Sequence, residues 1–313
     1  MSTVFDRSTR FRLMGIVNVT PDSFSGGGLF LETDVAVEHG LSLIEQGADI
    51  VDVGGESTRP GAEPVSAEDE LRRVLGVVEG LASAVKGMPT RLPARATAQI
   101  SIDTSKAVVA EAALCAGASL VNDVSAFRTD PAMAGVVASS GAECCLMHMR
   151  GEPRTMQRAG GPRYKDVVAE VKAFLEERLK FAVGEGVAEE RVLLDPGIGF
   201  GKTVAHNLEL LRRLEELTAL GRPLVIGTSR KGFLGTVAAS LGEPLQARHR
   251  LPGTIASNVL ALERGASVFR VHEVAPVREA LAVAAATLSG RWTQSSGTMT
   301  TGMSETTRPA GTS

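Results

Sequence analysis

Val192-Leu193-Leu194-Asp195-Pro196-Gly197-Ile198-Gly199-Phe200-Gly201-Lys202 is the stretch that decides the fold, because an apolar run stops at a carboxylate and turns into a glycine-rich loop before a helical pattern. This order predicts a buried strand with Asp195 at its C-terminal end. The loop differs from a phosphate-binding G-x-x-x-x-G-K-[ST] loop, since Pro196 stands where that motif requires glycine. We therefore assign the functional role to Asp195 and not to Lys202. A helix-capping aspartate beside a plain loop is the alternative.

Seven other segments have the same form, a short apolar run whose last residues are polar or charged. They span residues 12–18, 49–53, 99–103, 119–123, 143–148, 223–228 and 266–272. Helical patterns separate them, including 33–47, a run from the capping-box pattern at Ser66 to before Gly87, 251–264 and 276–288. Eight strand-then-helix units predict an α/β fold, a single (β/α)8 TIM barrel with its active site at the C-terminal ends of the strands. A doubly wound open sheet is the alternative.

The composition excludes several classes of protein. Lys and Arg number 33 against 36 Asp and Glu, so the net charge of -3 predicts no general binding to nucleic acid or to an anionic membrane. Three cysteines, two of them adjacent, indicate neither a disulfide framework nor a zinc site. We expect a soluble, cytoplasmic protein whose catalytic domain spans residues 12–290, between an N-terminal tail (1–11) and a disordered Ser-, Thr- and Gly-rich C-terminal tail (291–313).

Polar side chains at the strand ends should face one pocket. Side chains alternate between the two faces of a strand, so the polar ends would converge above the packed core of a barrel. The residues concerned are Asn18, Asp52, Asp103, Asn122 and Asp195. Clustered acceptors of this kind repel one another unless a ligand supplies donors, which favours a planar heterocycle with several N–H groups. For any single one of these residues, a structural role in capping a loop is the alternative.

A second group of residues is cationic. Thr228-Ser229-Arg230-Lys231-Gly232 begins a helix with two cations, which is unfavourable at the positive end of the helix dipole unless an anion or an electron-rich group lies nearby. A solvated first turn is the alternative. Arg270 and His272 share one strand face and could clamp a phosphate group through charge-assisted hydrogen bonds. A histidine satisfied within the core is the alternative for His272.

Seven motifs, in this order along the chain, resemble those of the dihydropteroate synthase family, and the resemblance extends from about Leu13 to Leu288. They are Asn18-Val19-Thr20-Pro21-Asp22-Ser23-Phe24, Asp52-Val53-Gly54-Gly55-Glu56-Ser57-Thr58-Arg59-Pro60-Gly61, Ser101-Ile102-Asp103-Thr104, Met147-His148-Met149-Arg150-Gly151, the stretch from Asp195 to Lys202, Ser229-Arg230-Lys231 and Arg270-Val271-His272. The resemblance implies a barrel enzyme of folate biosynthesis that transfers an alkyl group. It would join 7,8-dihydropterin-6-ylmethyl diphosphate to p-aminobenzoate and release diphosphate.

The resemblance also implies roles for individual residues. Asp103, Asn122 and Asp195 would hold the pterin edge, with Lys231 on its carbonyl side. Asn18 would ligate a Mg²⁺ ion that travels with the diphosphate, and Arg270 and His272 would grip that anion. The implied p-aminobenzoate sub-site comprises Thr58, Arg59, Pro60, Phe200, Ser229 and Lys231, and the implied catalytic residues are Lys231, Arg270, His272 and Asn18. The first loop, with Asp22 and Phe24, would have an ordering role. The family further implies a homodimer and is a target of sulfonamides.

The residues suit this reaction without the family name. Breaking a C–O bond to diphosphate requires charge to be neutralised on the leaving group, which Mg²⁺, Arg270 and His272 can provide, while acceptors around the pterin favour a developing carbocation. The arylamine attacks that cation, so we expect no covalent enzyme intermediate. The alternatives are a pterin-binding methyltransferase with a corrinoid partner, which needs no diphosphate grip, and a non-catalytic pterin-binding paralogue, which should have lost a leaving-group residue. None is missing here.

One position departs from the family. Members commonly carry Asp where this chain has Gly26, which Gly27 and Gly28 follow. Each glycine makes the loop costlier to order by roughly 0.5–1 kcal/mol. We therefore expect a comparatively high KM for p-aminobenzoate, unless Asp22 performs the task of the missing carboxylate.

Overall fold

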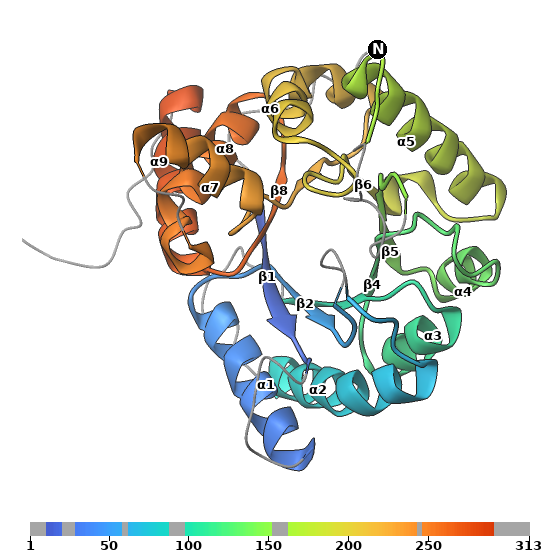
Figure 1. Cartoon of the computed structure of the whole chain (residues 1–313). Helices are drawn as coiled ribbons and strands as arrows, with labels where there is room; N and C mark the ends of the chain where they lie inside the picture. The colour runs from blue at the N-terminus through green and yellow to red at the C-terminus, as the bar shows by residue number, and fades with distance from the viewer. Residues whose placement is uncertain are drawn as a thin grey trace, which may run out of the picture.

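Eight parallel strands form the centre of the molecule, and helices surround them (Figure 1). The computed structural model describes residues 11–20, 29–57, 62–87, 98–151, 162–242 and 246–290, without the side chains of residues 29–32 and 241. The strands are β1 (Arg12–Asn18), β2 (Ile50–Gly54), β3 (Gln99–Asp103), β4 (Leu120–Asp123), β5 (Glu143–Met147), β6 (Val192–Asp195), β7 (Val225–Ile226) and β8 (Val268–Val271). Their order is β6-β5-β4-β3-β2-β1-β8-β7, and a parallel bridge between Leu194 and Leu224 joins the two ends. The predicted barrel is confirmed.

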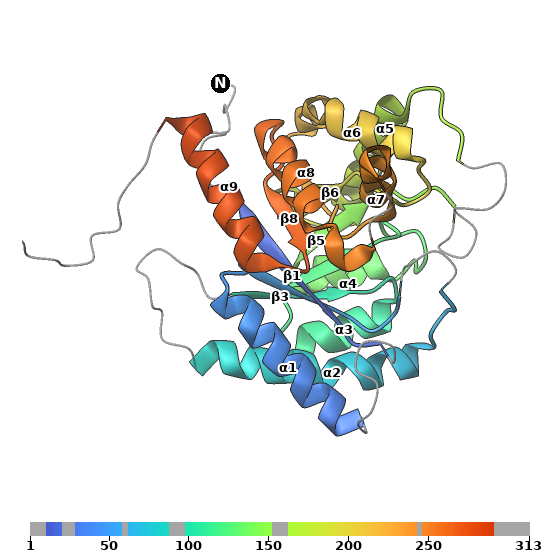
Figure 2. The ribbon, with the colours of Figure 1, turned by 60° about the vertical axis from the view of Figure 1, so that its left-hand side comes forward.

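Each strand leads to a helix that packs on the outside of the barrel (Figure 2). The α-helices are α1 (Leu29–Glu45), α2 (Ala67–Gly87), α3 (Ala107–Ala116), α4 (Met133–Ser140), α5 (Val167–Gly184), α6 (Val204–Arg212), α7 (Gly232–Ala238), α8 (Leu251–Glu263) and α9 (Val274–Ser289). The predicted cap of α2 is present, because the amide of Asp69 donates to Ser66 Oγ at 3.1 Å. Helix α1 begins four residues earlier than its apolar pattern indicated. None of the helices in the described ranges is long and apolar enough to cross a bilayer.

Strand β7 is much shorter than the sequence predicted. An apolar run indicated residues 223–228, but only Val225 and Ile226 pair as a strand, with Val268 and Phe269 of β8. Thr228 instead turns toward α8, where its hydroxyl donates to Asn258 Oδ1 at 3.0 Å and accepts from Ser257 Oγ at 2.8 Å. The barrel therefore closes at β6 and β7 with fewer ladder bonds than join the other described strands.

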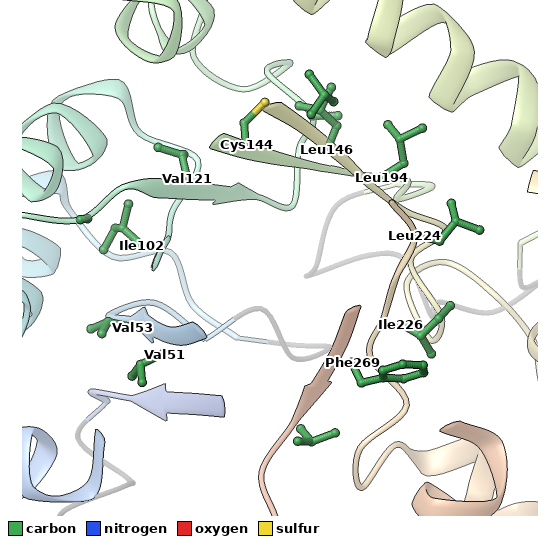
Figure 3. Packing of buried hydrophobic residues seen from close by; sticks show 14 of the residues in the cluster. Val51, Val53, Ile102, Val121, Cys144, Leu146, Leu194, Leu224, Ile226 and Phe269 are labelled. Carbon is green, nitrogen blue, oxygen red and sulfur yellow. The ribbon is translucent and has the colours of Figure 1, made fainter. Parts of the chain in front are cut away.

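Most of the buried apolar side chains form two layers, and a small third cluster contains Met147 and Met149 with Phe200 packed against them. The larger layer lies between the strands and the helices and includes Val53, Ile102, Leu146, Leu194 and Phe269 (Figure 3). The smaller layer fills the barrel interior and consists of Met14, Ile50, Leu120, Cys145, Leu193, Val225 and Val268. The adjacent Cys144 and Cys145 belong to different layers, as the alternation of side chains along β5 requires. Fully burying one such aliphatic side chain contributes about 1.5–3 kcal/mol.

Polar residues close the barrel interior at the N-terminal ends of the strands. Arg12 Nη1 donates to Glu143 Oε2 at 3.2 Å, and Gln99 Nε2 donates to the same oxygen at 3.0 Å. The expected terminal tails lie outside the described residues, apart from Phe11. The ring of Phe11 meets that of Phe269 edge-on, with 6.4 Å between the ring centroids.

Candidate functional site

Asp52 lies at the centre of the polar layer above the barrel core. Its side chain is completely buried, and side chains from β3, β4 and β8 donate to it. Ser101 Oγ donates to Oδ1 at 2.6 Å, while Asn122 Nδ2 and Arg270 Nε donate to Oδ2 at 3.0 and 2.6 Å. Because a carboxylate only accepts, the amide of Asn122 must turn its nitrogen toward Asp52. Its oxygen is thereby free to act as an acceptor on the other side.

Asp103 stands beside this centre and shares Arg270 with it. Arg270 Nη2 donates to Asp103 Oδ2 at 2.7 Å, and Asp103 is 8% exposed. Burial raises the pKa of Asp103 to about 7, with Arg270 lowering it and Asp52 raising it further. Because Arg270 and Asp52 shift the pKa of Asp103 in opposite directions, a ligand whose N–H groups donate to Asp103 can keep this carboxyl ionised.

Asp195 ends β6 as predicted. It lies on the same face of the strand as Leu193, which belongs to the apolar layer of the barrel interior. Asp195 is 6% exposed, and its Oδ1 accepts from the amide of Gly197 at 2.6 Å. Burial raises the pKa of Asp195, whereas Lys231 and the Gly197 amide lower it. Asp195 is thus a third buried carboxylate at the C-terminal ends of the strands, after Asp52 and Asp103.

Lys231 precedes α7 and turns back over the β6–α6 loop, which comprises residues 196–203. Its ammonium donates to the carbonyl of Ile198 and lies 4.6 Å from the ring centroid of Phe200. Burial lowers the pKa of Lys231 to about 8, and Asp195 raises it. The neighbouring Arg230 points elsewhere and pairs with Glu273. The structure therefore separates the two cations of the motif, and only Lys231 joins the acceptor pocket.

Ser229 and His272 form a pair at the ends of β7 and β8. Ser229 Oγ lies 2.9 Å from His272 Nδ1 and accepts from the amide of His272 at 3.2 Å. This contact joins a residue expected at the p-aminobenzoate sub-site to one expected at the diphosphate. The grip of Arg270 on diphosphate stays a prediction, since in this structure two of its nitrogens donate to Asp52 and Asp103.

Asn18 ends β1 and is partly exposed. Its side-chain oxygen is the kind of hard donor that Mg²⁺ prefers, and Mg²⁺ is commonly held by one or two protein oxygens together with substrate phosphates. Among the described residues, no group of three or more His, Cys, Asp or Glu side chains could hold a metal alone. The donor set fits a metal that arrives with a phosphate ligand.

Five of the predicted site residues lie outside the described residues. These are Thr58, Arg59 and Pro60 in the loop after β2, and Asp22 and Phe24 in the loop after β1. Gly26, the position that departs from the family, also lies outside the described residues. Sequence reasoning missed two features of the site. It did not predict that Arg270 pairs with Asp52 and Asp103, and it assigned no role to Lys202, which is buried beside His148. Spacing along one strand carries no signal for either contact.

Comparison with known proteins places the chain among pterin enzymes. The profile of the family described as pterin binding enzyme matches residues 14–272. The dihydropteroate synthase of Escherichia coli (strain K12) is 44% identical over 279 residues, which cover 89% of this chain and 92% of that protein. Dihydropteroate synthase of Xanthomonas albilineans has been solved with 4-aminobenzoic acid, and it aligns with a TM-score of 0.79 and 44% identity over 89% of this chain and 93% of that one. The same enzyme in complex with 7,8-dihydropteroate aligns with a TM-score of 0.75 and 41% identity, covering 89% and 94% of the two chains.

Proposed function

Because the chain belongs to the pterin-binding enzymes and, among them, to the dihydropteroate synthases, we propose roles for the residues that its barrel brings together. The enzyme condenses 7,8-dihydropterin-6-ylmethyl diphosphate with p-aminobenzoate and forms dihydropteroate and diphosphate. The observation that carries the assignment of the pterin site is the set of buried acceptors on three strands, Asp103, Asn122 and Asp195, each less than a tenth exposed.

The pterin binds with its N–H edge against these acceptors. Asp103 and Asp195 accept as carboxylates, and Asn122 accepts through the oxygen that its bond to Asp52 turns outward. The pKa of Asp103, raised to about 7 by burial, falls when pterin N–H groups bind, since hydrogen bonds to the charged form favour it. The Lys231 ammonium then faces the pterin carbonyl and partly neutralises the negative charge of Asp103 and Asp195.

The reaction proceeds by loss of diphosphate and attack by the arylamine. The bond between the pterin methylene carbon and the diphosphate oxygen breaks, and the electron pair leaves with diphosphate. Arg270 and His272 stabilise the charge that develops there. Asn18 would hold a Mg²⁺ ion, which supplies further positive charge at the diphosphate when bound. The nitrogen of p-aminobenzoate forms the new bond and loses one proton, so the enzyme forms no covalent bond to either substrate.

The p-aminobenzoate sub-site lies beside the pterin, next to Phe200 and Ser229. Phe200 stacks beneath the Lys231 ammonium, and Ser229 contacts His272 of the diphosphate grip. Thr58, Arg59 and Pro60 complete this sub-site in our proposal, and Asp22 and Phe24 order the first loop. These five residues lie outside the described part of the chain.

A coupled assay tests the proposed function. Purified enzyme receives pterin diphosphate, p-aminobenzoate and Mg²⁺, and the product is identified as dihydropteroate by mass. A pterin alcohol without diphosphate is the control and should give no product. Thermal melting separates the alternatives, because a ligand that binds the folded state stabilises it by RT ln(1 + [L]/Kd). A non-catalytic paralogue would be stabilised by pterin diphosphate and form no product, and a methyltransferase would gain nothing from diphosphate with Mg²⁺.

We also propose that the enzyme is a homodimer in a reducing cytoplasm. Helices α8 and α9 lie side by side on the outside of the barrel (Figures 1 and 2). They expose the apolar side chains of Leu260, Val283 and Leu288. The three cysteines are free thiols, as a reducing compartment would keep them. Light scattering coupled to size-exclusion chromatography gives the mass in solution, and a monomer mass would contradict the dimer.

A further inference from the structure

Lys202 is a buried lysine for which the reaction has no use. The residue is 2% exposed, and its amine lies inside the turn of the β6–α6 loop. Nζ is 2.9 Å from the carbonyl oxygen of Gly197, 3.1 Å from that of Phe200 and 2.8 Å from His148 Nδ1, with the carbonyl of His148 more distant at 3.4 Å. An ammonium group has three N–H donors, and the three nearer acceptors match them in number. A buried amine without such partners would be very costly.

The imidazole of His148 is the third near polar contact of this amine. Its ring is buried edge-on against Phe174, with 4.9 Å between the ring centroids. Burial, together with the charge of Lys202, lowers the pKa of His148 to about 2, so the ring is neutral. When Lys202 is charged it donates to Nδ1, and the ring proton then lies on Nε2. Burial lowers the pKa of Lys202 well below its usual value; among the charged groups that face it, Asp195 raises that pKa, and Lys231 and Arg150 lower it. Charged or neutral, the amine keeps N–H donors for the carbonyls of Gly197 and Phe200.

The loop around Lys202 interlocks with the β5–α5 loop, of which residues 148–151 and 162–166 are described. Gly197 has φ of 65°, and a Cβ atom there would lie 1.9 Å from the carbonyl oxygen of His148. Gly201 has φ of 58°, and a Cβ atom there would lie 2.2 Å from the carbonyl oxygen of Arg150. The two backbones therefore touch at Gly197 and at Gly201, and the Lys202 amine bridges them through its contacts with His148, Gly197 and Phe200.

We propose that Lys202 is a positioning residue for p-aminobenzoate, acting through the backbone of Phe200. This inference rests on the proposed function in taking Phe200 as part of that sub-site. The ammonium holds the carbonyl of Phe200, and the ring of Phe200 in turn contacts the Lys231 ammonium. Lys202 thus sets the distance between the aromatic wall of the sub-site and the lysine that faces both substrates.

The pterin acceptor Asp195 depends less on Lys202. Asp195 belongs to β6, where it pairs in register with Met147, and its backbone oxygen accepts from the amide of His148 at 2.9 Å. Its carboxylate also accepts from the Gly197 amide, and Lys202, which donates to the Gly197 carbonyl, acts on that carboxylate mainly through its charge, which lowers the pKa of Asp195. Loss of the Lys202 amine should therefore displace Phe200 more than Asp195. The two substrates then respond differently.

The variant Lys202→Met tests this, because methionine has a similar length and no N–H donor. We expect the KM for p-aminobenzoate to rise by roughly tenfold to a hundredfold, as a displacement near 1 Å can cause. The KM for pterin diphosphate should change by less than about threefold, within the scatter of a neutral surface change. Lys180→Met is the matched control, since Lys180 is exposed on α5 and pairs with the exposed Glu176 of the same helix. Both its KM values should equal those of the wild type.

Two further variants keep the test decisive if Lys202→Met does not fold. His148→Leu keeps the lysine and removes one acceptor, and it should also raise the KM for p-aminobenzoate selectively. Lys202→Ala should recover part of its p-aminobenzoate affinity with methylammonium, which has N–H donors, but not with tetramethylammonium. Unchanged p-aminobenzoate KM in a folded Lys202→Met or His148→Leu variant, or equal rises in both KM values, would overturn the inference. If the wild type forms no dihydropteroate, the proposed function fails instead.

Discussion

Replacing Arg270 by methionine should destabilise the enzyme in a pH-dependent way. Arg270 is the shared counter-charge of two buried carboxylates, with hydrogen bonds of 2.6 Å to Asp52 and 2.7 Å to Asp103. Its side chain is only 23% exposed, and those of its two partners are 0% and 9% exposed. Removing one partner of a buried ion pair costs about 3–5 kcal/mol, because the other charge stays buried without compensation. Each kcal/mol lowers the Tm of a large domain by about 2–4 °C, so the Tm should fall by roughly 6–20 °C.

The pH dependence follows from Asp103. Its pKa is about 7 in the folded enzyme and 3.8 for an aspartate without such surroundings, as in the unfolded chain. The free energy of unfolding therefore falls as the pH rises from about 4 to about 7. Arg270 limits that loss by holding the pKa down. Without Arg270 the pKa of Asp103 rises further, and the loss of stability continues above pH 7. The difference in Tm between wild type and Arg270→Met should therefore be larger at pH 8 than at pH 5.5.

Differential scanning calorimetry at the two pH values measures this difference. Arg12→Met is the matched control, because Arg12 points into the same barrel at its opposite end and pairs with the more exposed Glu143. That control should lose less stability and keep its activity. Arg270→Met should also slow the reaction far more than it weakens binding of a pterin without diphosphate. A Tm difference that is equal at both pH values would refute the role of Asp103. If the reaction slows no more than the binding of a pterin without diphosphate weakens, Arg270 would only stabilise the barrel.

The remaining predictions concern the other substrate contacts. Asp195→Ala should abolish detectable pterin binding in calorimetry with the fold largely intact, since charged hydrogen bonds in a desolvated pocket are worth roughly 1.5–3 kcal/mol each; wild-type affinity would remove Asp195 from the site. Burial lowers the pKa of Lys231 to about 8, so kcat/KM should fall as the pH rises through that value and Lys231 loses its charge. Lys231→Arg should lack this fall, and a profile like that of the wild type would assign it to another group. Gly26→Asp, in a loop outside the described residues, should lower the KM for p-aminobenzoate or raise kcat with pterin affinity little changed. Kinetics equal to those of the wild type would leave Asp22 as the acid that performs this task.

The strands could be predicted from the sequence because the signal for each is local. Apolar runs that end in polar residues placed β1 and β3 at their observed bounds, and the alternation of side chains correctly placed Asp103 and Asp195 at the strand ends. The bounds predicted for β7 were wrong because the run continues into a turn, where Thr228 bonds to α8 rather than to a neighbouring strand. Apolar composition reports burial and does not reveal which partner a backbone segment finds.

The contacts within the site were less predictable, because they join strands far apart in the chain. The bond from Arg270 to Asp52 spans 218 residues, and it depends on the registers of β1 with β2 and of β1 with β8. Lys202 escaped prediction for another reason. Its position after a glycine-rich loop resembles that of a solvated lysine or a phosphate-binding one, and only the fold of the loop upon itself buries the amine.

The interlocked backbones at Gly197 and Gly201 limit how this enzyme can change under selection by a drug that imitates p-aminobenzoate. Any missense mutation of a glycine codon adds at least a Cβ atom, and at these two positions that atom would collide with a carbonyl of the β5–α5 loop. A carbonyl of a packed loop cannot retreat as the tip of a flexible side chain can. Mutations that discriminate between substrate and drug are therefore blocked at Gly197 and Gly201, whereas a Cβ atom at Gly199 would first meet the side chain of Lys231, at 3.0 Å. Within this loop, adaptation falls mainly to ligand-facing side chains such as Phe200.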